Sequence, residues 1–375
     1  MLKFLRNLYK KFLVFEESYF IKDAPFQFGA RELKVSQKTL KDFYQNYYKV
    51  SFLKFLSNVK DIVYLKNPFD FLTKNAIEDW SFWYYLEFLE KEKIIKVGKN
   101  GKVDVLKKEI LDFIPRPQNF EEIKKKLEDK LELKIDEKKP VTSLFEKIKK
   151  FKIKPDYDQM PISAGSAIFL VQKILERLPL QKKFLFIGDD DFISIILSLA
   201  EPKIESKVID LDEDLLSFVD NLALKFNLKI ETERVDIEKK KSLKEKFSGF
   251  LISPVYTLEG TQEFLKYGVN QLAEEGGWVF LNLGDESIGN RYLFLQDFFT
   301  KQNLICREIV PKNIYYPFAK IHYPEDEIIS ERLFKMIDKK IVKKNPKLGA
   351  ALYVFEYVPF RIKKIKFQKS IYSYL

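Results

Sequence analysis

The chain has 375 residues, of which 46% are hydrophobic and 32% are charged, so it is long enough for two or three domains with sizeable cores. Its single cysteine and single histidine exclude an internal disulfide framework and a zinc site built from cysteines. No apolar run approaches the roughly 20 residues that cross a membrane. The first residues also lack the apolar core of a signal peptide, and we therefore expect a cytoplasmic protein.

The net charge of +11 is confined to the N-terminal part of the chain. Residues 1–155 hold 34 Lys and Arg against 23 Asp and Glu, which leaves 66 − 34 = 32 basic and 55 − 23 = 32 acidic residues in the remainder. We expect no nucleic-acid partner for the neutral C-terminal part, although the basic N-terminal region leaves such binding open. The scarcity of Cys, Met and His beside many Lys and Glu is typical of thermophile proteins, and an AT-rich genome gives a similar composition.

The N-terminal part predicts two segments. Residues 1–75 are rich in Phe, Tyr and Lys and are expected to form a helical extension whose fold the sequence does not define. Within residues 76–150, a helix at 76–94 precedes the short strands IIKV and VDVL, which the turn GKNG joins. This order is typical of the C-terminal part of a winged-helix unit, and a charged helical linker follows it. We interpret the aromatic run WSFWYY as core packing rather than a base-stacking platform.

Residues 151–375 alternate between short apolar strands and amphipathic helices, which predicts a doubly wound, largely parallel α/β sheet of the class I methyltransferase type. The last two strands lack a helix of the same kind between them and could pair antiparallel. Spermidine synthases share this layout. The expected strands are 183–187, 207–211, 228–236, 250–253, 277–283, 304–310 and 351–358, and the expected helices are 192–200, 213–226, 260–275 and 291–302.

Polar residues follow four of these strands, where ligands bind in such sheets. Each acid alone is more often a helix cap than a ligand, but their arrangement across successive strand ends favours a nucleoside site. They are Gly188 with Asp189, Asp190 and Asp191 after the first strand, Asp210 and Asp212 at the second, Asp236 at the third, and Ser253 and Tyr256 within SPVYT after the fourth.

The acid cluster GDDD indicates a cationic ligand. Three carboxylates would repel the carboxylate of S-adenosylmethionine, whereas decarboxylated S-adenosylmethionine and a polyamine are both cationic. Clustered acids also raise one another's proton affinity, which suits one of them to take a proton from an attacking amine.

GDDD, the upstream PDYDQ, VIDLDEDLL and EGTQEFLKYGVNQLAEEGGWVF resemble the branched-chain polyamine synthases, the N4-bis(aminopropyl)spermidine synthase family, over about residues 150–300. The resemblance implies a homodimeric aminopropyltransferase without a metal or resident cofactor. Its co-substrate would be decarboxylated S-adenosylmethionine, its acceptor spermidine or a related polyamine, and its by-product 5′-methylthioadenosine. A winged-helix-like N-terminal domain is also part of that family's plan.

The resemblance also implies a role for each acid. Asp190 would lie at the attacking amine, with Asp189 and Asp191 assisting in charge recognition. Asp210 would bind the ribose with Gly188 and Asp212 nearby, Asp236 the adenine, and Asp158 the acceptor.

One motif departs from the family. Where a DPPET-like sequence is expected after the fourth strand, this chain has SPVYT, so Ser253 replaces an aspartate and Tyr256 replaces a glutamate. Two negative charges are thereby lost from the acceptor side. A different acceptor, reduced activity or a paralogue without catalysis would each account for the change.

Two other functions stay open. The chain could be an amino-group methyltransferase that acts on nucleic acid, because SPVY weakly resembles the [DN]PP[YF] motif of such enzymes. It could also be a winged-helix regulator that senses polyamines through a degenerate synthase domain. His322 is interpreted as a solvated histidine rather than a general base, and Cys306 as a core residue of a strand rather than a nucleophile.

Overall fold

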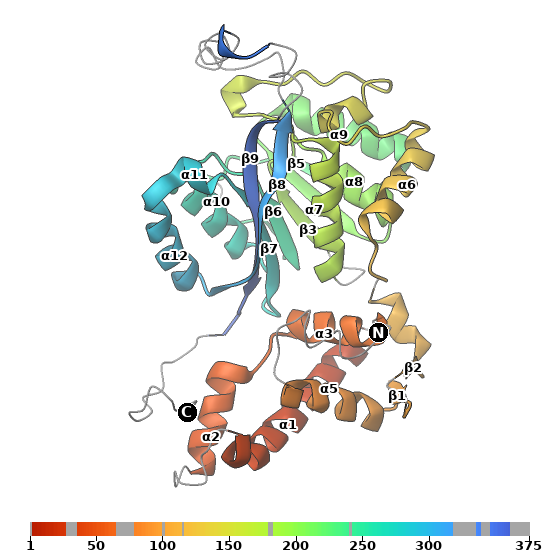
Figure 1. Cartoon of the computed structure of the whole chain (residues 1–375), viewed down its shortest axis with the longest axis vertical. Coiled ribbons are helices and arrows are strands. Elements are labelled where there is room, and N and C mark those ends of the chain that lie inside the picture. The colour runs from red at the N-terminus through yellow and green to blue at the C-terminus, as the bar shows by residue number, and fades with distance from the viewer. Residues whose placement is uncertain are drawn as a thin grey trace. The chain divides into compact units, whose positions relative to one another are not determined.

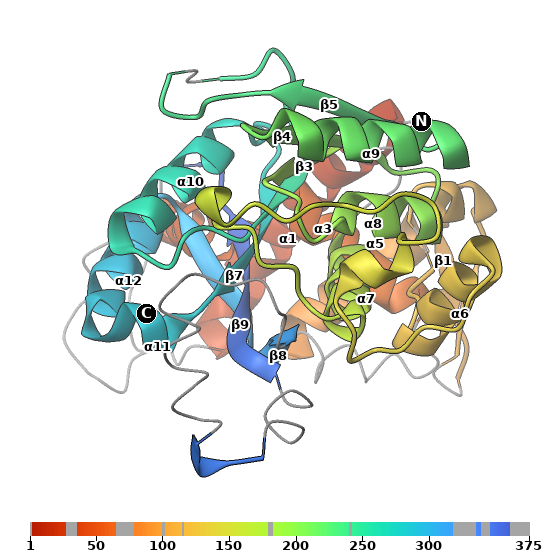
Figure 2. The ribbon, with the colours of Figure 1, turned by 90° about the horizontal axis from the view of Figure 1, so that it is seen from above.

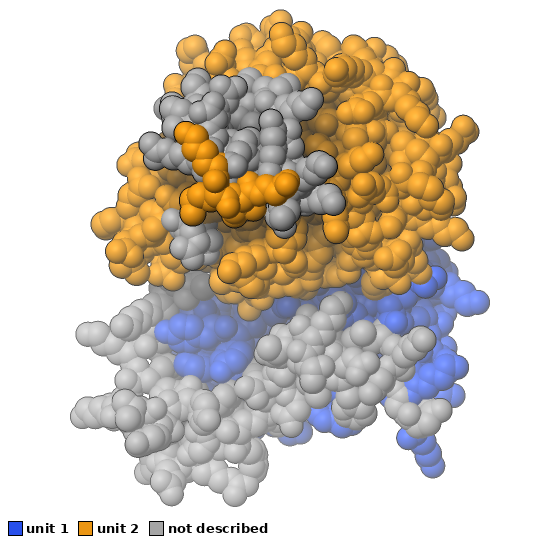
Figure 3. Space-filling model, turned by 45° about the horizontal axis from the view of Figure 1, so that its top comes forward, with its two compact units in different colours: residues 1–116, 358–375 blue, residues 117–357 orange. Residues whose placement is uncertain are grey.

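A computed structural model describes residues 2–27, 36–64, 79–99, 102–114, 116–178, 183–239, 242–317, 335–338 and 346–360. His322 and half of the expected GKNG turn lie outside these residues. The chain divides into two compact units, residues 1–116 with 358–375 and residues 117–357 (Figure 3). The charged segment 117–150 therefore groups with the second unit.

The described residues of the first unit are helical apart from one small hairpin and the loops between elements. Its helices pack through aromatic rings, since Phe12 has ring centroids of Phe55, Tyr85 and Phe88 within 4.9, 4.3 and 5.2 Å. Its elements are α1 (Leu2–Gln27), α2 (Gln37–Phe43), the π-helix η1 (Tyr44–Tyr48), α3 (Phe52–Tyr64), α5 (Asp79–Lys91), β1 (Ile95–Val97), β2 (Val103–Val105) and the 3₁₀ helix η2 (Lys108–Asp112).

Three aromatic residues of the run in α5 belong to the core of this unit. Phe82, Tyr84 and Tyr85 are at most 3% exposed, which confirms the expectation of core packing, while Trp83 is 60% exposed. After α5, β1 and β2 pair antiparallel, with Ile95 opposite Val105. A helix followed by a two-stranded ribbon agrees with the winged-helix interpretation, which stays a prediction.

The second unit contains a seven-stranded mixed sheet with the order β5-β4-β3-β6-β7-β9-β8 (Figure 1). The first five of these strands in the chain run parallel, and β9 pairs antiparallel with both β7 and β8. The strands are β3 (Lys183–Ile187), β4 (Glu205–Asp210), β5 (Ile230–Arg234), β6 (Gly249–Ile252), β7 (Gly277–Leu283), β8 (Leu304–Pro317) and β9 (Pro346–Tyr357). The predicted class I methyltransferase-like doubly wound sheet is thus confirmed, together with the antiparallel pairing of its last two strands.

Helices cover both faces of the sheet, with α7, α8 and α9 on one side and α10 and α12 on the other (Figure 2). Because both faces are covered, β6 and β7 are buried along their whole length, as their mainly apolar sequences predict. The helices are α6 (Phe120–Leu131), α7 (Ala164–Arg177), α8 (Ile193–Ala200), α9 (Glu213–Phe226), α10 (Leu258–Asn270), α11 (Asp285–Ile288) and α12 (Tyr292–Lys301), with short 3₁₀ helices η3 (Val141–Leu144), η4 (Pro155–Tyr157) and η5 (Gly289–Arg291).

The expectation for Cys306 is half correct. It lies in a strand, as predicted, but it is exposed rather than part of the core. The reason is that β8 is an edge strand, and its side chains are buried only at intervals along its length.

Candidate active site

The carboxyl ends of three neighbouring strands meet at one edge of the sheet. Ile187 at the end of β3 pairs with Ile209 of β4 on one side and with Ile252 of β6 on the other. The residues that follow these strands are therefore close together. Strand order reverses at β3, and this switch point is where doubly wound sheets bind ligands.

A cavity of about 90 Å³ opens at this switch point. Ligand pockets usually span roughly 300–1,000 Å³, so this cavity has room for one narrow segment of a ligand rather than for a nucleoside. Five of the site residues predicted from the sequence line it: Asp158, Asp190, Asp191, Ser253 and Tyr256. The full lining is Asp158, Met160, Asp190, Asp191, Ser253, Pro254, Tyr256 and Tyr316.

The three acids of the GDDD turn have different surroundings. Asp189 accepts hydrogen bonds from the backbone amides of Ile193 (2.8 Å) and Ser194 (3.2 Å) and from the Ser194 hydroxyl, so it caps the first turn of α8. It is 2% exposed and does not line the cavity. Burial raises the pKa of Asp189 well above its ordinary value.

Asp190 and Asp191 both face the cavity and are both held by the segment before α7. Asp190 Oδ2 accepts from the amide of Met160 at 2.9 Å, and Asp191 Oδ1 accepts from the amide of Ile162 at 2.8 Å. Burial, followed by the charge of Asp210, raises the pKa of Asp190 to about 7. Burial, followed by the charge of Asp190, raises the pKa of Asp191 well above its ordinary value. Such neighbouring carboxyls hold protons that ordinary aspartates lose.

Gly188 and Asp210 lie beside each other at the ends of β3 and β4. Gly188 has φ +76°, a conformation that favours glycine, and a Cβ at this position would lie 3.8 Å from Asp210 Oδ2. Asp210 Oδ1 accepts from the amide of Asp212 at 2.8 Å. Burial raises the pKa of Asp210 to about 6. An open backbone next to a carboxylate suits a polyhydroxyl group such as a ribose.

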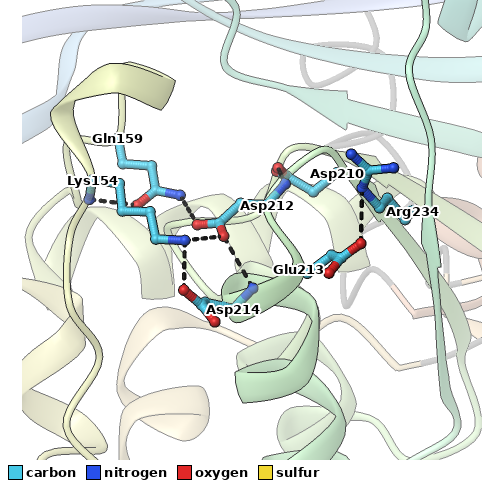
Figure 4. A network of polar contacts seen from close by, with 7 residues as sticks. All are labelled: Lys154, Gln159, Asp210, Asp212, Glu213, Asp214 and Arg234. Atoms are coloured by element: carbon cyan, nitrogen blue, oxygen red, sulfur yellow. Dashed lines mark hydrogen bonds and ion pairs between the residues drawn. The ribbon is translucent and has the colours of Figure 1, made fainter.

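The side chain of Asp212 takes part in a network of polar contacts (Figure 4). Its two oxygens contact Lys154 Nζ (2.6 Å) and Gln159 Nε2 (2.8 Å), and it caps α9 by accepting from the Asp214 amide at 3.0 Å. Lys154 Nζ also lies 2.6 Å from Asp214 Oδ2. Burial opposes ionisation, but these contacts together outweigh it and lower the pKa of Asp212 below its ordinary value.

Asp236, expected to read the adenine, lies outside the cavity lining. It accepts from the amide of Glu238 at 3.1 Å and forms an ion pair with Lys239 at 2.7 Å. The Lys239 hydrogen bond, which outweighs a smaller effect of burial, lowers the pKa of Asp236. Asp158, by contrast, lines the cavity and is solvent-exposed, with φ +56°.

Ser253 and two tyrosines line the cavity together with the acids. Ser253 Oγ accepts from Asn282 Nδ2 at 2.8 Å, and the hydroxyls of Tyr256 and Tyr316 are 2.7 Å apart. The absence of a side chain at Gly284 makes room for Tyr256, because a Cβ there would lie 2.6 Å from the Tyr256 ring. Burial raises the pKa of both tyrosines, so their hydroxyls are neutral.

Sequence reasoning missed several residues of this site. Tyr316 and Asn282 lie on β8 and β7, far from the acids in sequence, and no motif marks them. Lys154 could have been suspected, because it immediately precedes PDYDQ. Within the described part of the chain, no group of three or more His, Cys, Asp and Glu residues is arranged to hold a metal ion. Nor is any described helix long and apolar enough to span a bilayer.

Comparison with known protein families finds a match to more than half of the chain. The family model for the branched-chain polyamine synthase A C-terminal domain matches residues 142–371. An N(4)-bis(aminopropyl)spermidine synthase of Methanocaldococcus jannaschii is 30% identical over 127 residues, which are 32% of this chain and 36% of that protein. An uncharacterized protein of the same organism is 29% identical over 167 residues, 44% of this chain and 42% of that protein. The alignments thus span less than half the length of these relatives.

Among solved structures, a mutein of the Thermus thermophilus branched-chain polyamine synthase is similar to this chain. It is in complex with N4-aminopropylspermidine and 5′-methylthioadenosine. The TM-score is 0.49 with 16% sequence identity, and the match covers 88% of this chain and 94% of that one.

Proposed function

Because the chain belongs to the family of the branched-chain polyamine synthase A C-terminal domain, which its residues 142–371 match, we propose that it is an aminopropyltransferase. It moves the aminopropyl group of decarboxylated S-adenosylmethionine to an amine of spermidine or a related polyamine. The amine nitrogen attacks the carbon attached to the sulfonium, a C–N bond forms, and the C–S bond breaks. 5′-Methylthioadenosine leaves with the sulfur electron pair, and the amine releases one proton.

The observation that carries this proposal is the cavity that Asp190 shares with Asp191 and Asp158. Both substrates bring positive charge to the reacting centre, and carboxylates in a partly buried cavity attract cations more strongly than they do in water. The narrow volume of about 90 Å³ suits an alkylamine segment. Asp191 and Asp158 contribute to charge recognition in this proposal.

Asp190 takes the proton of the attacking amine. Its pKa of about 7 is close to the value at which a general base is both deprotonated and able to hold a proton near neutral pH. Its hydrogen bond from the Met160 amide fixes one carboxylate oxygen and leaves the other for the amine.

The nucleoside part of the donor binds across the strand ends next to this cavity. Asp210 accepts hydrogen bonds from the ribose hydroxyls, with Gly188 allowing a close approach, and Asp236 reads the adenine. Asp189 supports the turn through α8, and Asp212 supports it through its contacts with the segment that carries Asp158. These assignments follow the order of the strands, because each residue lies at or just beyond a strand's carboxyl end.

SPVYT gives the acceptor side a neutral wall. Ser253 and Tyr256 contact the methylene carbons and amines of the acceptor through hydroxyl groups and a ring, while all formal negative charge comes from the aspartates. An acceptor with few charged nitrogens beyond the reacting one fits this wall best.

The test is product analysis with purified full-length protein. Decarboxylated S-adenosylmethionine is supplied with putrescine, spermidine or spermine in turn, and both products are quantified by mass spectrometry. The expected result is a polyamine enlarged by one aminopropyl group for each 5′-methylthioadenosine released. Methyl transfer from S-adenosylmethionine to RNA or DNA, with no aminopropylated product, would contradict the proposal.

A further inference from the structure

Residues 154–162, here called the bridge segment, join two turns that follow different strands. At its start, Lys154 contacts Asp212 and Asp214, and Gln159 contacts the second oxygen of Asp212. Gln159 Oε1 also accepts a hydrogen bond from the Lys154 amide at 2.8 Å, and this bond joins the two ends of residues 154–159. The start of the bridge segment is thereby fixed to the turn after β4.

The other end of the bridge segment is fixed to the turn after β3. The amides of Met160 and Ile162 donate to Asp190 and Asp191 at 2.9 and 2.8 Å. Between its two anchored ends the segment carries Asp158, which lines the cavity with Met160. One short stretch of chain therefore contacts both the proposed acceptor cavity and the turn of the proposed ribose-binding carboxylate.

A continuous chain of contacts follows from this arrangement. Asp210 accepts from the Asp212 amide at 2.8 Å, Asp212 holds Lys154 and Gln159, and the bridge segment holds Asp190. Asp212 is 1% exposed, and its partner Lys154 is 29% exposed, so their ion pair is partly shielded from solvent and salt. We infer that Lys154 is a positioning residue that couples binding of the nucleoside at Asp210 to binding of the amine in the cavity.

The physical basis of the coupling is shared ordering. A ligand whose hydroxyls donate to Asp210 further restricts the motion of the turn after β4, and through Lys154 it further restricts the bridge segment, Asp158 and the amide that orients Asp190. The second ligand then meets a cavity that is already ordered, so it binds more tightly. By linkage the effect is reciprocal, and each ligand strengthens the other by the same factor. This inference rests on the proposed function.

The experiment is titration calorimetry on the full chain with 5′-methylthioadenosine and spermidine, each alone and each in the presence of the other. For the unchanged protein we expect mutual enhancement within the range of about 5- to 150-fold that is common for coupled sites. In Lys154→Met this factor should fall to about 1, with equal values measured from either ligand. Lys154→Arg, which keeps the charge and can contact two carboxylates, should retain most of it.

Two further variants separate positioning from general loss of structure. Lys207→Met removes an ion pair with Glu233 (2.8 Å) in the same sheet from a lysine that is 12% exposed, and it should leave the enhancement unchanged. Lys154→Met could fail to fold, because it leaves Asp212 buried without its cation. The double variant Lys154→Met with Asp212→Asn removes both charges while Asn still caps α9, and it should fold and lose the enhancement.

The outcomes are distinct for the two proposals. If the unchanged protein binds neither ligand, the proposed function fails. If it binds both without enhancement, or if the folded Lys154 variants keep the full factor, the function stands and the role of Lys154 is overturned. Loss of enhancement in Lys207→Met would also overturn it, because general loosening of the domain would then explain the result.

Discussion

Burial, followed by the charge of Asp210 at the end of the neighbouring strand, raises the pKa of Asp190 to about 7. Asp190 follows β3 and Asp210 is the last residue of β4, and these strands pair in parallel up to Ile187 and Ile209. The proposed base and the proposed ribose-binding carboxylate are thus linked electrostatically. Binding of the donor at Asp210 therefore bears on the protonation of the group that activates the acceptor.

Replacing Asp190 by Asn should abolish most turnover while leaving the nucleoside site largely intact. A positioned general base contributes roughly 10²- to 10⁴-fold to a rate, so we expect a loss of that order in kcat for aminopropyl transfer. Affinity for 5′-methylthioadenosine should change by less than about threefold, since Asp190 is proposed to act on the amine. Steady-state kinetics and calorimetry measure the two effects separately.

Asp129→Asn is the matched control for this variant. Asp129 is an exposed residue of α6, in the same structural unit, and the substitution removes the same charge from a solvated position. Its kcat should equal that of the unchanged protein. A kcat for Asp190→Asn within a factor of about two of the control would remove Asp190 from the mechanism.

The pH dependence of kcat should report Asp190 and should respond to Asp210. A base must be deprotonated to act, so activity should rise with pH through a value of about 7 and then level off. Asp210→Asn removes a negative charge that favours the protonated form of Asp190. The rising limb should therefore shift to lower pH by about one unit, measured with saturating donor. A limb that stays in place or moves to higher pH contradicts this electrostatic link.

The sheet was predictable because short strands with a mainly apolar interior, such as β3, β6 and β7, alternate with helical segments. The bounds predicted for β3 and β7 match those of the structure, since parallel strands with both faces covered are mainly apolar, with Lys183 and Asn282 as the polar exceptions. Once the strands were predicted, the acids at their ends could be expected to lie close together, because the carboxyl ends of parallel strands meet at one edge of the sheet.

The separate roles of the three GDDD acids could not be predicted. Whether an acid in this turn caps α8 or enters the cavity depends on backbone angles such as the φ of +50° at Phe192. Such angles cannot be predicted from the amino-acid composition of the turn. Asp189 satisfies the helix, and only the next two acids line the cavity. The position of Tyr316 in the site could not be predicted either, because Tyr316 lies next to Tyr256 only as a result of the antiparallel addition of β8 and β9 to the parallel sheet.

The hydrogen bond between Tyr256 and Tyr316 should be visible as non-additive stability. Tyr316 is 5% exposed, so removing the Tyr256 hydroxyl leaves a buried hydroxyl that has lost its partner. Each single Tyr→Phe variant should lose about 1–3 kcal/mol in the free energy of unfolding, whereas the double variant should lose less than the sum. Urea unfolding of all four proteins gives the coupling energy. Strict additivity would mean that the two hydroxyls do not interact in solution.

The raised pKa values of Asp190 and Asp210 also predict how the free energy of unfolding depends on pH. In the unfolded chain both groups titrate near 3.9, whereas in the folded protein they titrate at about 7 and about 6. Between these values the folded state binds more protons than the unfolded state. Their contribution to stability is therefore most favourable below about pH 4, falls as pH rises toward 7, and is constant above it.

The double variant Asp190→Asn with Asp210→Asn isolates this effect, because asparagine does not titrate. Urea unfolding at pH 5 and pH 8 should show that the difference in stability between the double variant and the unchanged protein grows at the higher pH, by a few kcal/mol. Asp212 acts in the opposite sense, since its pKa is lowered, and the subtraction removes its contribution. Spermidine should make the difference in stability at pH 8 smaller, because a cation in the cavity favours the ionised carboxylates of the unchanged protein. A difference that is equal at the two pH values would mean that neither carboxyl holds its proton in the folded protein.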